Sequence, residues 1–124
     1  MSAVLDTERP VARWVPPDPM GRTLMAKFFR ALGDPTRLGL AEFCAERERT
    51  GAECVSHAGL SQGRVSAHLG CKVSCGLLTL RRASRFAHYQ VTDPRVLQLL
   101  RISQEMVAAQ AVSIAVCTKV RPAR

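Results

Sequence analysis

The sequence predicts a mainly α-helical fold that carries one small β-hairpin. Over several segments, apolar residues recur at three- and four-residue steps, as they do on one face of an amphipathic helix. Only 5% of the residues are aromatic, so the core must be built from Leu, Val, Ala and Met, which favours helices. Near residue 80, two apolar runs flank a short polar segment, which is typical of a hairpin. A chain of 124 residues is expected to form one domain.

An arm and two helices are predicted at the N-terminal end. Residues 1–19 are rich in proline and are expected to be extended, because proline interrupts a regular helix. Residues 20–32 have the apolar spacing of an amphipathic helix. Asp34 is expected to cap a second helix over residues 35–46, whose first residue is a proline. The charged residues 46–50 are predicted to form a turn, with no assigned role.

A short helix, a tight turn and a longer helix are expected next. The short helix covers about residues 52–58. Ser61 is a natural N-cap for the longer helix, which carries residues 62–75 and ends at Gly76. This pair of helices has the layout of a helix-turn-helix, in which the longer helix reads DNA.

A hairpin and a final helix complete the predicted domain. The hairpin strands are residues 77–80 and 86–91, and its basic tip is residues 81–85. Asp93 and the proline after it open the last helix, which is expected to extend to about Cys117. Helices followed by a hairpin with a basic tip describe a winged helix-turn-helix.

We expect this domain to cover residues 20–117 and to be followed by a loose basic tail at residues 118–124. The net charge is +8, from 18 Lys and Arg residues against 10 Asp and Glu residues. Such an excess on a small domain favours a polyanionic partner, above all nucleic acid.

The protein is expected to act in the cytoplasm. No apolar run approaches the roughly 20 residues that a membrane span needs. Asp6 and Glu8 stand where a secretory signal would be apolar. In the cytoplasm cysteines stay reduced, and five cysteines is an odd number for a disulfide framework. The thiols are therefore expected to be metal ligands, redox sensors or core residues.

Two of these thiols lie on the predicted recognition helix. Cys71 and Cys75 are four residues apart, so their Cβ atoms are expected on one helix face, roughly 5–6 Å from each other. Two thiolates at that spacing can chelate one soft metal ion. The spacing therefore indicates a regulator that responds to a metal through the same helix that reads DNA.

Other interpretations of the cysteines are also open. Cys71 and Cys75 could be ordinary buried small residues, or one of them could pair with Cys117 on oxidation in a redox sensor without metal. Cys44 is expected in the core, and Cys54 is either a core residue or an accessory thiol. An enzyme is not expected, because no Gly-rich phosphate loop and no paired carboxylates on one face are present.

Four segments resemble the ArsR/SmtB family of metal-responsive transcriptional repressors, which are homodimers that release DNA when metal binds. These segments are Ala31-Leu-Gly-Asp-Pro-Thr-Arg37, Gln62-Gly-Arg-Val-Ser-Ala-His-Leu69, Cys75-Gly-Leu-Leu78 and Arg85-Phe-Ala-His-Tyr-Gln-Val91.

Within this family, the pair Cys71 and Cys75 with Cys117 near the C-terminus is similar to the CmtR type. That resemblance implies a sensor of Cd²⁺ or Pb²⁺ with three thiolate ligands, two from this helix and one from the tail of the other subunit. Arsenite or antimonite, As(III) or Sb(III), is an alternative effector for the same cysteines.

The chain also departs from other patterns in the family. Where a Cys-Val-Cys motif is often found, it has Cys54-Val-Ser-His57, with a single thiol. No histidine lies between Asp93 and Cys117, so a zinc site on the last helix is not expected.

The helix-turn-helix and its wing predict the DNA contacts. Residues in the first turns of the recognition helix are expected to meet base edges, and arginines of the wing to meet phosphate or the minor groove. The candidates are Gln62, Arg64, Ser66 and, more weakly, His68 on the helix, and Arg81, Arg82 and Arg85 in the wing. A homodimer formed by the first and last helices would read a pseudo-palindromic operator.

Overall fold

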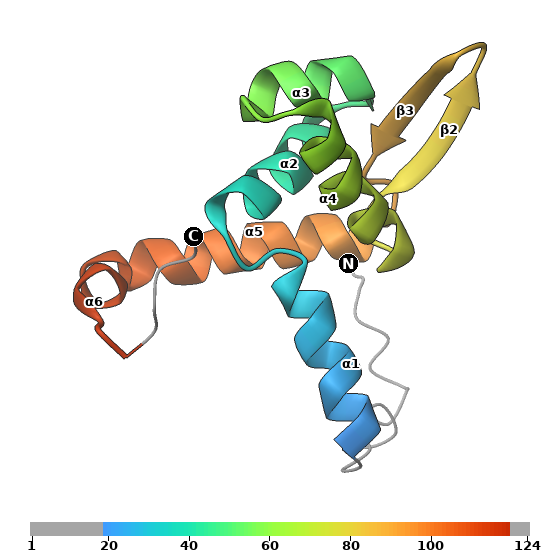
Figure 1. The fold of residues 1–124 in the computed structure, drawn as a ribbon. Coiled ribbons are helices and arrows are strands. Elements are labelled where there is room, and N and C mark those ends of the chain that lie inside the picture. Colours follow the sequence, from blue (N-terminus) through green and yellow to red (C-terminus); the bar gives the residue numbers. More distant parts are fainter. Residues whose placement is uncertain (1–18, 120–124) are drawn as a thin grey trace.

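The computed structural model describes residues 19–119. The elements in chain order are α1 (Pro19–Arg30), α2 (Pro35–Glu46), β1 (Arg49–Thr50), α3 (Gly51–Ala58), α4 (Gln62–Ser74), β2 (Thr79–Ala83), β3 (Phe86–Gln90), α5 (Pro94–Ala109) and α6 (Ala111–Val116) (Figure 1). The fold is therefore mainly helical with a small sheet, as predicted. The predicted arm lies outside the described residues except for Pro19, which begins α1.

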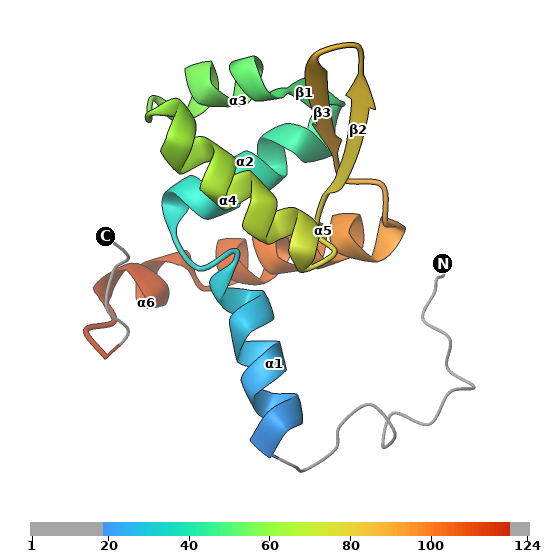
Figure 2. The same ribbon diagram turned by 45° about the vertical axis from the view of Figure 1, so that its right-hand side comes forward.

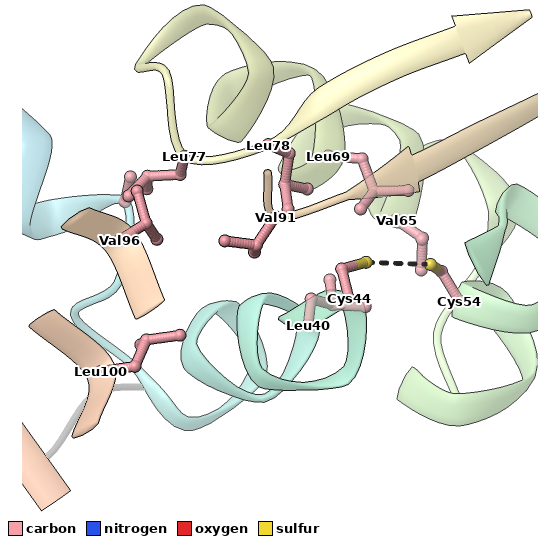
Figure 3. Packing of buried hydrophobic residues seen from close by; sticks show 11 residues of the cluster. Leu40, Cys44, Cys54, Val65, Leu69, Leu77, Leu78, Val91, Val96 and Leu100 are labelled. Carbon is pink, nitrogen blue, oxygen red and sulfur yellow. Dashed lines mark hydrogen bonds between the residues drawn. The ribbon is translucent and has the colours of Figure 1, made fainter. Parts of the chain in front are cut away.

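Helices α2, α3 and α4 pack together above α5, and the hairpin of β2 and β3 extends beside α4 (Figures 1 and 2). Their buried side chains form one apolar cluster (Figure 3). This cluster contains Ala31, Leu40, Cys44, Cys54, Val65, Leu69, Leu77, Leu78, Val91, Val96 and Leu100. Because α4 contributes Val65 and Leu69 to it, the opposite face of α4 is left exposed.

Local side-chain caps fix where the helices begin. The Asp34 carboxylate accepts a hydrogen bond from the Arg37 N–H at 2.8 Å, and the Ser61 hydroxyl accepts one from the Arg64 N–H at 3.3 Å. Both caps were predicted from sequence, and both are confirmed. Such a cap satisfies one of the N–H groups that a helix leaves without a partner in its first turn.

The prediction of a simple charged turn at residues 46–50 is wrong, because Arg49 and Thr50 form strand β1. This strand pairs with β3 in an antiparallel sheet of order β1-β3-β2. Arg49 is only 7% exposed. Its guanidinium donates to the Phe43 carbonyl at 2.9 Å and to the Glu46 carboxylate at 2.6 Å, and it lies 3.7 Å from the centre of the Phe43 ring. These contacts satisfy the buried charge of Arg49.

The wing differs from the predicted hairpin in where its tip begins. Strand β2 extends to Ala83, so Arg81 and Arg82 lie within a strand, opposite His88 and Ala87 of β3. Only two residues, at positions 84 and 85, connect the strands, and Ser84 has a φ of 59°. Because neighbouring side chains of a strand point to opposite faces, Arg81 and Arg82 have different surroundings.

The last helix is broken. The sequence predicted one helix to about Cys117, whereas Gln110 leaves helical geometry with φ −124° and ψ 20° and separates α5 from α6. No proline or glycine stands at the break, and nothing in the local sequence explains it. Cys117 follows α6 and is exposed. None of the helices in residues 19–119 is long and apolar enough to cross a membrane.

Helices α1, α5 and α6 leave much apolar surface uncovered. α1 projects from the body and buries no residue, and α5 buries only Val96 and Leu100 (Figure 2). The exposed large apolar residues of these helices are Met20, Leu24, Met25, Phe29, Ile102, Met106, Val107, Val112, Ile114 and Val116. Uncovered apolar surface of this extent is typical of a protein interface.

Candidate nucleic-acid interface and thiol site

A groove of about 520 Å³ lies between α4, the start of α3 and the wing, with Val65 and Leu69 among its α4 residues. Four of the predicted DNA-contacting residues line it: Gln62 and Ser66 from α4, and Arg82 and Arg85 from the wing. Gln62 and Ser66 are four residues apart and therefore share one face of the helix. The structure thus brings helix residues with hydrogen-bonding side chains and wing arginines to the same concave surface.

The other predicted helix residues lie outside this groove. Arg64 is exposed on the first turn of α4 but does not line the groove. His68 is half-buried. Its burial, together with the positive charges of Lys72 and Arg37, lowers the pKa of His68 below its usual value. A neutral, half-buried imidazole near α2 is placed to pack within the domain.

Arg81 is held within the protein by an ion pair. Its Nε and Nη2 atoms donate to the two Glu48 carboxylate oxygens at 3.0 and 2.8 Å. His88 Nδ1 lies 3.8 Å from the same carboxylate. The hydrogen bonds from Arg81 lower the pKa of Glu48 below its usual value. Arg82 and Arg85, by contrast, form no ion pair with any described residue, so their charges are available to a ligand.

Cys71 and Cys75 lie on the last turn of α4, at the end remote from its N-cap. Cys75 is the C-cap residue and keeps near-helical backbone angles of φ −85° and ψ −1°. Its N–H donates to the Cys71 carbonyl at 3.0 Å, which confirms the predicted one-turn spacing. Cys71 is exposed and Cys75 is half-buried. Burial, and then the neighbouring Cys71 thiol, raise the pKa of Cys75 above its usual value.

Cys117 does not join this pair within one subunit. It follows α6, at the far end of α5 (Figure 1). Within residues 19–119 of a single chain, no three His, Cys, Asp or Glu side chains are grouped so that they could hold a metal ion. A site with three thiolates would therefore need a cysteine from a second subunit.

The structure also places two other cysteines and one lysine in the interior. Cys44 is buried, as predicted, and Cys54, whose role the sequence left open, is buried beside it. Lys72 was missed by the sequence analysis, although it is only 1% exposed. The signal was available: Lys72 follows Val65 and Leu69 at the four- and three-residue steps of the buried face. Burial lowers the pKa of Lys72 below its usual value.

Helices α3 and α4 form a helix-turn-helix, and the β-hairpin beside it shares a groove with α4. This arrangement defines the fold as a winged helix-turn-helix, a class of DNA-binding domains. Comparison with known proteins identifies the family within this class. Residues 34–79 match the family of bacterial regulatory proteins called the arsR family. The chain is also 50% identical, over 95 residues, to a probable mercury resistance operon repressor of Streptomyces lividans, which covers 77% of this chain and 76% of that protein. The chain therefore belongs to the arsR family of transcriptional regulators and is not an enzyme.

More distant relatives and solved structures agree with this assignment. The regulator CmtR of Mycobacterium tuberculosis is 29% identical over 90 residues, which are 73% of this chain and 76% of CmtR. The crystal structure of M. tuberculosis Rv0081 has a TM-score of 0.70 and 30% identity, and covers 81% of this chain and 99% of that one. A homodimeric winged helix-turn-helix DNA-binding domain of Mycobacterium bovis, Mb0332, has a TM-score of 0.63 and 26% identity, with 71% and 81% covered.

Proposed function

We propose that this chain is a repressor that binds operator DNA as a homodimer in the cytoplasm and releases it when a thiophilic metal ion binds its cysteines. One observation carries the proposal: Cys71 and Cys75 occupy the last turn of the helix whose first turns line the groove beside the wing. An ion held by these thiols acts directly on the element that reads DNA. The 50% identity to a probable mercury resistance operon repressor supports both the repressor role and the metal response.

Hg²⁺ is the effector that we propose first. Thiolates select soft ions, and Hg²⁺ forms stable complexes with only two of them. One subunit supplies such a pair in Cys71 and Cys75, and the relative with the higher identity is named for mercury resistance.

Cd²⁺ or Pb²⁺ is the second candidate, favoured by the presence of Cys117 as a possible third thiolate and by the weaker similarity to CmtR. As(III) could use the same three sulfurs. These ions would require Cys117 of the partner subunit, because one subunit does not gather three ligands.

The proposed DNA contacts follow from the groove. We propose that Gln62 and Ser66, which line the groove, and Arg64, which is exposed on the first turn of α4, meet base edges, where Arg can pair with guanine and Gln with adenine. Arg82 and Arg85 form no ion pair with any described residue, and we propose that they contact phosphate and fix the position of the domain on the duplex. Arg81 is assigned a different role from the one that the sequence suggested: it holds the wing to Glu48.

The proposed dimer uses the apolar surfaces of α1, α5 and α6, and the similarity to a homodimeric domain of M. bovis supports a homodimer. Two-fold symmetry places two α4 helices in successive major grooves and predicts a pseudo-palindromic operator.

Thermodynamic linkage requires that metal weaken DNA binding by the same factor as DNA weakens metal binding. A coupling free energy of about 1–3 kcal/mol between the two sites is typical.

The test is a set of separate titrations of Hg²⁺, Cd²⁺, Pb²⁺ and arsenite into the reduced protein bound to its own promoter fragment. DNA release is followed by fluorescence anisotropy, and metal binding by thiolate-to-metal ultraviolet absorption. The effector is the ion that releases DNA as the absorption saturates. Release by mild oxidation alone, with no response to any ion, would instead establish the redox interpretation.

The matched variants are Cys75→Ser and Ser74→Ala, which alter neighbouring residues near the end of α4. We expect Cys75→Ser to bind DNA as well as the parent and to lose the response, while Ser74→Ala keeps both properties. If Cys75→Ser releases DNA at the same ion concentration as the parent, the proposed site is wrong.

A further inference from the structure

Two thiols meet in the interior of the helix-turn-helix, away from the thiols of α4. Cys44 comes from α2 and Cys54 from α3, and both side chains are completely buried. Their Sγ atoms are 3.9 Å apart, and they point toward each other (Figure 3). Neither residue lines the groove beside the wing. The pair therefore has no part in the DNA contacts or in the metal site proposed above.

The distance between the sulfurs suits a bridging ion better than a disulfide. Metal–sulfur bonds of about 2.3 Å, as in zinc sites, separate two sulfurs by about 3.8 Å at a tetrahedral angle and about 4.6 Å when the bonds are collinear. Starting from 3.9 Å, even a collinear ion requires the sulfurs to separate by only about 0.7 Å. A disulfide of about 2.05 Å would require them to approach by about 1.9 Å in a packed core.

The surroundings provide positive charge but no further ligand. The hydrogen bond between the two thiols has the largest effect on their pKa values, since it raises that of Cys44 and lowers that of Cys54, and burial raises both. The charge of Arg49, which is buried near the pair, lowers both pKa values by a smaller amount, and the charge of buried Lys72 lowers that of Cys44. No third His, Cys, Asp or Glu joins the pair among the described residues. An ion that needs three or four ligands is therefore disfavoured.

We propose that Cys44 and Cys54 form a second, buried binding site for a soft ion that accepts two ligands, such as Hg²⁺. On binding, each thiol loses its proton to solvent, two S–H bonds are replaced by two metal–sulfur bonds, and no oxidation state changes. A dication with two thiolates is neutral, as are the two protonated thiols, so the core gains no net charge. Only the choice of Hg²⁺ as the ion rests on the proposed function.

The two sites differ in how an ion can reach them. Cys71 is exposed, so the site on α4 can fill directly from solvent. The pair between α2 and α3 can fill only when these helices separate locally, because both sulfurs are inaccessible in the native packing. Binding to the native protein should therefore show a fast phase from the thiols of α4 and a slow phase from the buried pair.

The test uses the full chain with Cys71→Ser, Cys75→Ser and Cys117→Ser combined, so that the buried pair holds its only thiols. We expect one Hg²⁺ per subunit, with thiolate-to-metal absorption and loss of both free thiols. An ion that binds the native state raises Tm, by about 10 °C or more at a hundredfold excess over Kd. Adding Cys44→Ala should abolish binding and the rise in Tm.

The proposal is overturned if the triple variant binds no Hg²⁺ under native conditions. It is also overturned if Hg²⁺ lowers Tm, because that result means that the ion binds the thiols of the unfolded chain more tightly than those of the native protein. Both readings come from the triple variant itself and do not depend on the folding of the Cys44→Ala variant. They are made without DNA, so they are separate from the Cys75→Ser test: either site can fail while the other stands.

Discussion

The wing offers a sharp test of which arginines meet DNA. Arg82 and Arg85 have no ion pair among the described residues and line the groove beside α4, whereas both Glu48 oxygens accept hydrogen bonds from Arg81. Each phosphate neutralised by a protein cation contributes about 0.9 to the slope of log K against log salt concentration. In a homodimer, Arg85→Met removes two such contacts, so the magnitude of this negative slope should decrease by about 1.8. Between 50 and 200 mM salt, the loss of affinity would then be about twelvefold smaller than in the parent.

The matched control removes the internal ion pair without changing the net charge. Glu48→Gln combined with Arg81→Met takes away one negative and one positive group, and the expected salt slope is that of the parent. Its absolute affinity can fall, because the wing loses the contact that joins β2 to the residue before β1. The slope, rather than the affinity, therefore distinguishes a DNA contact from a structural one.

The assay is fluorescence anisotropy of a labelled promoter fragment at several KCl concentrations, without metal and with reductant. Arg82→Met and Arg85→Met should each lower the slope, and the double variant at positions 48 and 81 should not. An equal decrease in the double variant would refute the reasoning, because it would mean that Arg81 leaves Glu48 to bind phosphate.

Four further predictions follow from single features of the structure. Lys72→Met should raise the free energy of unfolding by about 1–3 kcal/mol, because the buried amine has no hydrogen bond or ion pair among the described residues. In the parent, the free energy of unfolding should rise as the pH approaches 10.5, because over this range the unfolded lysine holds a proton that the folded one has lost, and Lys72→Met should remove this rise. Urea denaturation at several pH values measures both effects, and a variant less stable than the parent would contradict them. Thr50→Ala removes the capping box with Glu53 and should lower the free energy of unfolding by about 1 kcal/mol in the same assay. An unchanged urea midpoint would contradict this prediction. Metal affinity should rise from mildly acidic to mildly alkaline pH, because the ion displaces the proton that the raised pKa of Cys75 retains; a flat profile in competition titrations would exclude this thiol as a ligand. Met106→Glu places a charge on the exposed face of α5 and should give monomers in sedimentation, whereas an unchanged dimer would place the interface elsewhere.

Features that depend on local chemistry could be predicted from the sequence. Asp34 and Ser61 cap the helices that follow them, because a cap involves only residues three positions apart. The spacing of Cys71 and Cys75 on one helix turn is local in the same way. The order of the elements predicted that α4 and the hairpin both contact DNA, and the structure brings residues of both to one groove.

Features that depend on tertiary contacts could not be predicted in this way. Two residues are too few to show a strand pattern, so β1 was predicted as a turn. The contact of Cys44 with Cys54 joins two helices, and no spacing within either helix reveals it. Arg81 was predicted to contact DNA at the tip of the wing, and its ion pair with Glu48 was not foreseen because it joins residues 33 positions apart in the chain. Lys72 was missed because a lysine gives no apolar signal, although its spacing places it on the buried face of α4.

The short strand β1 has a mechanical consequence for any response to a ligand. It directly precedes α3 and pairs with β3, so hydrogen bonds connect the wing to the start of the helix-turn-helix. This pairing couples the position of the wing to that of the helix-turn-helix, so a shift of one is passed to the other. In a dimer, the distance and angle between two such units also determine how well they fit the duplex, and α1 and α5 carry the apolar surface that we propose joins them. Substitutions in that surface should alter the preferred spacing of half-sites while leaving the preferred bases unchanged.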